Sequence, residues 1–182
     1  MQDIDNQNDI IKSKSVIEVI AIASEYCLFI DKMDAYEYAE AISFLQKILP
    51  ALYLKGSLFP NIEIEDNSAD ERFITEEEYE TMRYRLSNYL GDKDFFSTVD
   101  LMEGDTESKP ISLSELLSDI YLDLKDFLLL YAKESQSAKE NAVADCYYYF
   151  HKSWGMRLAM ALPYIHLLCT NGTDDRDENS DY

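Results

Sequence analysis

The fold class is decided by one stretch of the chain, Ser112-Leu-Ser-Glu-Leu-Leu-Ser-Asp-Ile-Tyr-Leu-Asp-Leu-Lys-Asp-Phe-Leu-Leu-Leu-Tyr131. Its apolar residues recur every three or four positions, which is the period of an amphipathic α-helix. Ser112 and Glu115 have the spacing of a capping box, and Ile111 and Leu116 have the spacing of a hydrophobic staple. The stretch therefore predicts a helix that begins at Ser112 and presents one apolar face to a core.

Four further segments show the same period. They are residues 15–30, a segment that Asp34 caps and Pro50 interrupts, a segment that runs from Thr75 to Gly91, and residues 137–169. The third of these opens with a second capping box, Thr75 with Glu78. The chain has only 5 Gly and 4 Pro, too few for the many turns of a sandwich or barrel. We predict an all-α fold, a single-domain antiparallel bundle of about five helices.

The length and composition indicate one folded domain. Hydrophobic residues make up 47% of the chain and charged residues 29%, a balance typical of globular proteins. A chain of 182 residues can bury a single core. We expect a flexible N-terminus at 1–14, the helical bundle at 15–170 and a disordered acidic tail at 171–182, with an exposed acidic loop at 61–74.

The charge balance excludes several classes of partner. The chain has 36 acidic and 16 basic residues, a formal net charge of -20. Nucleic-acid binding through phosphates requires clustered Lys and Arg, and so does docking on an anionic membrane surface. No apolar run is long enough to span a bilayer. The three cysteines, Cys27, Cys146 and Cys169, lie among apolar residues without a C-x-x-C motif, so we expect reduced thiols and a cytoplasmic location.

Three stretches together resemble a known family. They are Leu49-Pro-Ala-Leu-Tyr-Leu-Lys-Gly56, Ser114-Glu-Leu-Leu-Ser-Asp-Ile-Tyr-Leu-Asp-Leu-Lys-Asp-Phe127 and Phe150-His-Lys-Ser-Trp-Gly155. They resemble an uncharacterised family of bacterial all-helical proteins, known only as a domain of unknown function. The resemblance covers about residues 15 to 170 and implies a single cytosolic all-α bacterial domain. It implies no activity and no catalytic residues.

An acidic arc on the central helix is the first candidate site. Glu115, Asp119, Asp123 and Asp126 share one side of the helix, where like charges repel. With Glu40 from the second helix, Asp119, Asp123 and Asp126 could bind Mg²⁺ or Mn²⁺, the only cofactors the sequence suggests. Such a site would resemble that of the all-α nucleoside triphosphate pyrophosphatases, which hold Mg²⁺ on paired acidic motifs. The alternative interpretation is a solvated acidic face.

A second candidate is a pocket that contains His151, Trp154 and Arg157. An aromatic ring, a base that titrates near neutral pH and a cation could together bind a ligand beside the carboxylates of the central helix. In the alternative interpretation, Trp154 belongs to the core and His151 donates a hydrogen bond to an acid. The pattern leaves both open.

The scarcity of catalytic residue types favours a non-enzymatic bundle that binds a protein partner. Nucleotide-binding, hydrolase and zincin motifs are missing from the sequence. A basic partner would suit the acidic charge, and Leu122 with Leu129 is a candidate docking patch unless another helix covers it. Two alternatives remain. One is a divalent-metal enzyme or sensor, and the other is an acidic decoy that sequesters a basic nucleic-acid-binding protein.

Overall fold

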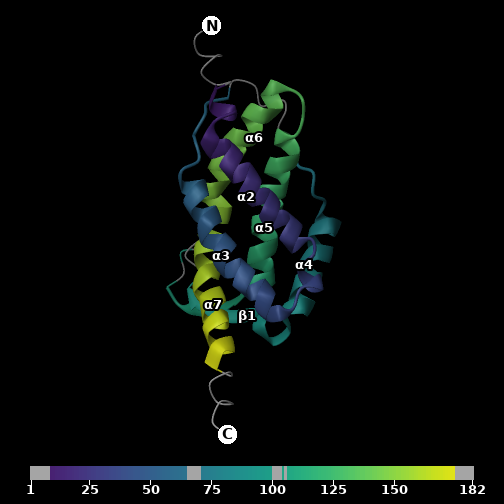
Figure 1. Cartoon of the computed structure of the whole chain (residues 1–182), viewed down its shortest axis with the longest axis vertical. Helices are drawn as coiled ribbons and strands as arrows, with labels where there is room; N and C mark the ends of the chain where they lie inside the picture. Colours follow the sequence, from purple (N-terminus) through teal and green to yellow (C-terminus); the bar gives the residue numbers. More distant parts are fainter. Residues whose placement is uncertain (1–8, 65–70, 100–103, 105, 175–182) are drawn as a thin grey trace.

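The computed structural model describes residues 9–64, 71–99, 104 and 106–174, and it is a helical bundle (Figure 1). The helices are α2 (Lys14–Ile30), α3 (Tyr38–Ser57), α4 (Glu76–Leu90), α5 (Leu113–Tyr131), α6 (Gln136–Tyr149) and α7 (Gly155–Asp174). The chain also forms two 3-10 turns (Met33–Ala35 and Gly91–Lys93), a π-helical segment (Phe150–Trp154) and a hairpin of strands β1 (Phe95–Val99) and β2 (Ser108–Ser112). The predicted all-α bundle is confirmed, with one small sheet added.

The helix of the deciding stretch, α5, lies at the centre of the bundle. It packs against α2, α4, α6 and α7, while α3 packs against α7 and α2. Its inward residues, among them Leu117, Ile120 and Leu124, are fully buried. The central position explains why α5 has the longest apolar stripe, because four neighbours cover it. None of the described helices is long and apolar enough to cross a bilayer.

Both predicted capping boxes mark real helix starts. The Thr75 side chain accepts the backbone N–H of Glu78, and the Glu78 side chain accepts the backbone N–H of Thr75. Ser112 caps α5 by accepting the backbone N–H of Glu115. In contrast, the cap of α6 lies two residues before the predicted start at 137. The Ser135 side chain accepts the capping hydrogen bond from the backbone N–H of Ala138. Capping hydrogen bonds join residues that are close in sequence, so the sequence alone can predict them.

The second predicted helix differs from its expected form in two ways. Asp34 is not its N-cap, since it lies in the 3-10 turn before α3, and Glu37 occupies the N-cap position. Pro50 lies inside α3, which continues to Ser57. A proline removes one helical hydrogen bond and crowds the preceding turn. Here the packing of α3 against α7 and α2 keeps the helix whole.

The segment predicted as one helix over 137–169 is continuous but not uniform. The π-helical segment Phe150–Trp154 joins α6 to α7 without a break. Gly155 follows this segment, and a Cβ atom there would lie 2.4 Å from the carbonyl oxygen of Phe150. A larger residue would therefore collide with the widened turn. Single-turn π segments inside α-helices are frequent at functional sites.

The hairpin is the element that the helical pattern did not predict. Strands β1 and β2 pair antiparallel, with Phe95 opposite Ser112 and Val99 opposite Ser108. Asp94, which is 1% exposed, anchors the hairpin to α5. Its carboxylate accepts hydrogen bonds from the Ser87 hydroxyl at 2.7 Å and from the backbone N–H of Ser114 at 2.7 Å. This buried carboxylate ties the end of α4, the hairpin and the start of α5 together.

The domain limits also differ from the expected ones. Ile11, placed in the flexible N-terminal segment by the sequence pattern, is 1% exposed and belongs to the core. The Tyr131 hydroxyl donates a 2.8 Å hydrogen bond to its carbonyl oxygen. At the other end, α7 continues to Asp174, past the predicted start of the tail at 171. Residues 1–8, 175–182 and part of the predicted acidic loop lie outside the described residues.

Candidate functional site

The three aspartates of the acidic arc lie in a charged cluster. We use this name for Asp119, Asp123 and Asp126 on α5, Ser153 in the π-helical segment, Arg157 on α7, and Arg72 before α4. The i,i+4 and i,i+3 spacings place the aspartates on one side of α5. This side faces the π-helical segment, α7 and the chain before α4, so the cluster joins four parts of the sequence.

Arg157 neutralises the first aspartate of the cluster. Its Nε donates to Oδ2 of Asp119 at 2.6 Å, and its Nη1 donates to the Ser153 hydroxyl at 2.8 Å. The Tyr79 hydroxyl donates to the other oxygen of Asp119 at 2.6 Å. Burial, followed by the hydrogen bond to Asp119, raises the pKa of the Tyr79 phenol, which stays protonated as a donor. Both oxygens of Asp119 therefore have donors.

Asp126 is 5% exposed and has three hydrogen-bond donors. Its Oδ1 accepts the backbone N–H groups of Phe73 at 2.9 Å and Ile74 at 3.2 Å, and its Oδ2 accepts Nη1 of Arg72 at 2.9 Å. The Arg72 guanidinium also lies over the Tyr149 ring, 4.4 Å from its centroid. Asp126 thus fixes the chain that leads into α4, which is a structural task.

Asp123 lies between the other two aspartates. Its Oδ2 accepts a hydrogen bond from the Ser153 hydroxyl, and its Oδ1 lies 3.6 Å from Nη1 of Arg72. Burial raises the pKa of the Asp123 carboxyl above its ordinary value, although the Ser153 hydrogen bond and the charge of Arg72 oppose this shift. The π-helical segment is the element that brings the Ser153 hydroxyl to this carboxylate.

The four predicted metal ligands are not brought together. Glu40 lies on α3 and lines a hollow between α2 and α3, apart from the aspartates of the charged cluster. Within residues 9–64, 71–99, 104 and 106–174, no group of three or more His, Cys, Asp or Glu side chains could hold a metal ion. Arginines from other elements offset the repulsion expected along α5.

The predicted pocket of His151, Trp154 and Arg157 does not form either. Trp154 is fully buried and packs edge-on against Phe150, as the alternative interpretation has it. His151 is exposed, and its Nδ1 lies 3.0 Å from the carbonyl oxygen of Tyr147. Arg157 lines a cavity of about 560 Å³ beside the hairpin, with Lys109, Ser112, Glu115 and Asp119. His151 and Trp154 both contact the Phe150 ring, but no cavity is lined by all three predicted residues within the described part of the chain.

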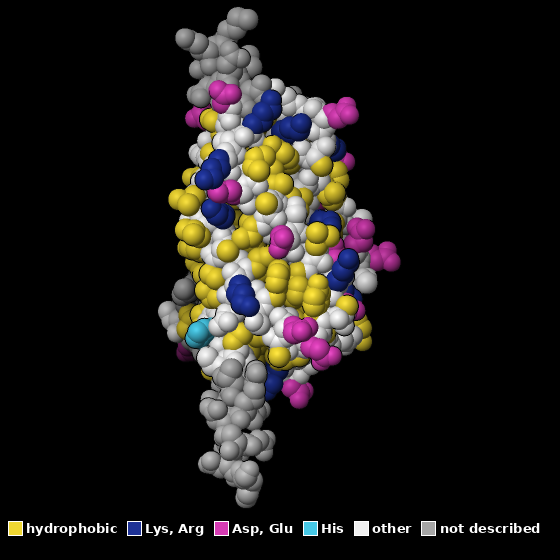
Figure 2. All heavy atoms as spheres, in the orientation of Figure 1, with side chains coloured by type: hydrophobic (Ala, Val, Ile, Leu, Met, Phe, Trp, Pro, Cys, Tyr) yellow, Lys and Arg dark blue, Asp and Glu magenta, His cyan; other side chains and the backbone are white. Residues whose placement is uncertain are grey.

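A groove between α2 and α3 is the larger hollow, and the sequence analysis did not predict it. Two adjoining cavities of about 670 and 530 Å³ share Glu25, Phe44 and Lys47. We call them together the α2–α3 groove. Further lining residues are Glu18, Ala21, Ile22, Leu28, Phe29, Lys32, Tyr36, Glu40, Ser43, Ile48 and Lys55. The groove lies on the face of the molecule seen in Figure 2, where apolar side chains gather.

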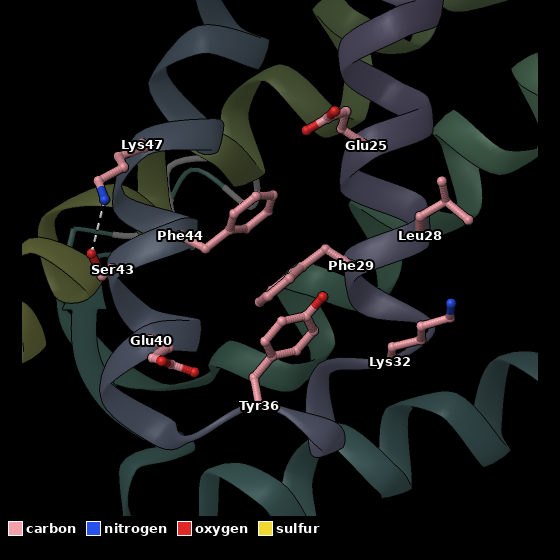
Figure 3. Close-up of a pocket in the computed structure, with 9 residues that line it drawn as sticks. All are labelled: Glu25, Leu28, Phe29, Lys32, Tyr36, Glu40, Ser43, Phe44 and Lys47. Carbon is pink, nitrogen blue, oxygen red and sulfur yellow. Dashed lines mark hydrogen bonds between the residues drawn. The ribbon is translucent and has the colours of Figure 1, made fainter.

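The floor of the groove is apolar and its margins are charged (Figure 3). The rings of Phe29 and Phe44 stack across it, with centroids 4.1 Å apart. Leu28 on the margin is 60% exposed. A signal was available in the sequence, since Glu18, Glu25 and Lys32 recur every seven residues beside Ile22 and Phe29. Such a spacing places Glu18 and Glu25 on one side of α2, with Lys32 just after its end, next to Ile22, which the core buries only in part.

The predicted docking patch on α5 is less open than this groove. Leu122 is half-buried and Leu129 is 38% exposed. Because α5 has neighbours on several sides, little of its second apolar stripe reaches the surface. Among the described residues, the more open apolar hollow therefore lies between α2 and α3 and not on α5.

Comparisons with known proteins agree with the fold. A family model described as a domain of unknown function, DUF5063, matches residues 10–171. The crystal structure of protein BF1032 from Bacteroides fragilis is similar, with a TM-score of 0.77 and 31% sequence identity over 86% of this chain and 93% of that chain. No curated protein matches the sequence. The chain belongs to the family of the domain of unknown function DUF5063.

Proposed function

We propose that this protein is a non-enzymatic docking module that binds a second polypeptide in the α2–α3 groove. The observation that supports this proposal is the open apolar floor around Phe29 and Phe44 between charged margins. Helix pairs that leave such a groove are used for peptide and helix recognition, in which apolar anchors enter the groove and charged margins set the register. A surface of this kind on a monomer marks an interaction site.

The state of the carboxylates favours docking over the metal alternative. A metal-dependent enzyme needs carboxylate oxygens that are free to bind a cation. The oxygens of Asp119, Asp123 and Asp126 accept hydrogen bonds from arginine, serine, tyrosine and backbone groups. A cation would have to displace these donors, including the two backbone N–H groups that the buried Asp126 carboxylate accepts.

The decoy alternative has less support for a similar reason. A mimic of DNA needs acidic side chains along one face at phosphate-like spacing. Glu76, Glu77 and Glu78 instead occupy the first turn of α4, where acidic side chains interact favourably with the positive end of the helix dipole. The margins of the α2–α3 groove carry both acids and lysines, so the proposed partner has mixed charge rather than a basic surface alone.

We also place the protein in the cytoplasm. Cys27, Cys146 and Cys169 are all free, and burial raises the pKa of the Cys27 thiol to about 12. Free cysteines that stay protonated in a core suit a reducing compartment.

The proposal can be tested in the cells that make this protein by site-specific photo-cross-linking. A photoreactive phenylalanine derivative replaces Leu28 at the margin of the groove. In a matched control it replaces Tyr148, which is 54% exposed on α6, a helix that packs on α5. We expect a discrete cross-linked protein from position 28 that position 148 does not give. No product at position 28, or the same products at both positions, would overturn the proposal.

A further inference from the structure

We infer that the occupant of the α2–α3 groove is a second copy of this chain, packed face to face about a two-fold axis that runs along the groove. This inference rests on the proposed docking function and names its partner. Two-fold dimers are the commonest oligomers, and their interfaces must be self-complementary, so each surface patch must match its own rotated copy. The charges on the groove margins meet that requirement.

The margin charges form three levels along the groove, each with one acid and one lysine on opposite sides; Lys32 lies in the turn after α2, and the other five residues lie on α2 or α3. At the level nearest the N-terminus of α2, Nζ of Lys55 donates to Oε2 of Glu18 at 2.8 Å. At the other two levels the acid and the lysine lie on opposite sides of the groove (Figure 3), and Nζ of Lys47 donates to the Ser43 hydroxyl at 3.1 Å. The levels are Glu18 with Lys55, Glu25 with Lys47, and Lys32 with Glu40.

A two-fold axis along the groove exchanges the helices and keeps the levels. The second copy then lays its α2 over α3, and every acid meets a lysine. The Glu25 carboxylate, for example, faces the ammonium group of the other copy's Lys47. An axis across the groove would reverse the levels and place Glu25 against its own copy, and Lys47 against its own copy. Because like charges at contact disfavour association, the charge pattern selects the first axis.

The apolar residues of the groove suit the same arrangement. Along that axis, Phe29 of the second copy lies over Phe44, so the two stacked ring pairs cover each other. The margin charges on α2 recur every seven residues, as do Glu40 and Lys47 on α3. Charged residues at this spacing flank the apolar seam of packed helices and set which helices pair and in which direction. The groove therefore has both parts of a helix–helix interface.

The length of the contact predicts moderate affinity. The thirteen residues from Glu18 to Ile30, where α2 ends, span about 20 Å of helix. Two helices of that length present an area at the small end of specific interfaces, for which micromolar dissociation constants are common. Self-association should therefore depend on concentration and should decrease with salt, because exposed charge pairs are screened.

The test is the mass of the full chain by sedimentation at protein concentrations up to about 0.1 mM, where a micromolar dimer is filled. We compare the wild type with Glu25→Lys and Lys47→Glu. Each variant places like charges together in a self-dimer, which should raise the dissociation constant about tenfold or more. A matched control, Lys139→Glu on α6, makes the same charge change away from the groove.

A mixture of the two variants gives the decisive result. One variant has lysine at both positions and the other has an acid at both, so the mixture should form a heterodimer although each alone is weakened. A wild type that stays monomeric at 0.1 mM, or a dimer that Glu25→Lys leaves unchanged, or a mixture that does not associate overturns the inference. If Leu28 still cross-links to a different protein, the docking function stands and only its partner is wrong.

Discussion

The charged cluster and the α2–α3 groove show similar charge patterns in sequence and opposite roles in structure. Asp119, Asp123 and Asp126 recur at helical spacing beside an apolar stripe, and so do Glu18, Glu25 and Lys32. In the cluster, the aspartates are satisfied by donors from other elements and close the bundle. In the groove, the charges lie on open margins above an apolar floor.

The comparison shows that helical spacing alone does not distinguish a buried ionic network from a binding surface. What distinguishes them is the partner brought by the tertiary structure. Arg72 and Arg157 are far from the aspartates in sequence, but both donate to them. An arginine fork offers several donors in a fixed geometry, which satisfies buried carboxylates well. Among the described residues, none donates a hydrogen bond to the carboxylates of Glu25 and Glu40 from another element.

The largest expected effect contrasts the interior next to the cluster with the margin of the groove. Trp154→Ala removes a fully buried ring and should lower the free energy of unfolding by about 3–5 kcal/mol. Leu28→Ala, at a residue that is 60% exposed, should change it by less than about 0.5 kcal/mol. Urea denaturation of both variants measures the difference. Equal losses would remove the distinction between the two regions.

The second prediction contrasts two acids. Asp126→Ala leaves the N–H groups of Phe73 and Ile74 and the Arg72 guanidinium without their acceptor, and should cost about 2 kcal/mol. The loss comes mainly from the backbone donors, because the Arg72 side chain is partly exposed and solvent screens its charge. Glu40→Ala on the groove margin should cost less than about 0.5 kcal/mol. Thermal and urea unfolding of the two variants measure both losses. Equal losses for Asp126→Ala and Glu40→Ala would contradict the difference expected between the charged cluster and the groove.

The third prediction concerns pH and separates Asp123 from its neighbours. Burial raises the pKa of its carboxyl above the ordinary value of 3.8, so the folded state holds the proton more tightly than the unfolded state. Its contribution to stability is therefore complete below pH 3.8 and is lost as the pH rises through the raised pKa. We would measure the free energy of unfolding of the wild type and of Asp123→Asn from pH 3 upward. The stability of the wild type relative to the variant should decrease across that range. A difference that does not vary with pH would show that the carboxyl titrates normally.

The smallest expected effect is that of divalent cations. Specific binding at a hundredfold excess over the dissociation constant stabilises a protein by about 2.7 kcal/mol, which for a chain of this size is about 5 °C or more in Tm. Because the cluster carboxylates already have donors, Mg²⁺ or Mn²⁺ at constant ionic strength should shift Tm by less than about 1 °C. A larger shift that Asp119→Asn removes would restore the metal interpretation.

The sequence predicted those parts of the fold that depend on neighbours along the chain. The capping residues Thr75 and Ser112 act on N–H groups three residues away, so their positions were correct. The hairpin was missed because its strands are short and half-exposed, and because the buried Asp94 that anchors it binds residues on both α4 and α5. The predicted interruption at Pro50 does not occur, because tertiary packing overrides the low helix propensity of proline and α3 continues to Ser57.

The candidate site follows the same division. The three aspartates lie on one side of α5, as predicted. Their hydrogen-bond donors were not predicted, because Arg72 and Ser153 come close to them only when the bundle forms. The groove was missed although its seven-residue charge spacing is present in the sequence. Periodicity shows that α2 is apolar over much of its surface, and only the packing shows that Ile22 stays partly exposed while Val19, Tyr26 and Phe29 are buried.

By itself, the sequence determined the helical class, the positions of the capped helix starts and the family, because apolar period, caps and motifs are local and additive. The tertiary structure alone decided which charges are buried and which are open. Burial depends on the elements that surround a side chain, and a carboxylate changes from a possible metal ligand to a structural acceptor when an arginine from a distant segment donates to it. In this protein, packing buries the central helix in the core and leaves the α2–α3 groove open to solvent.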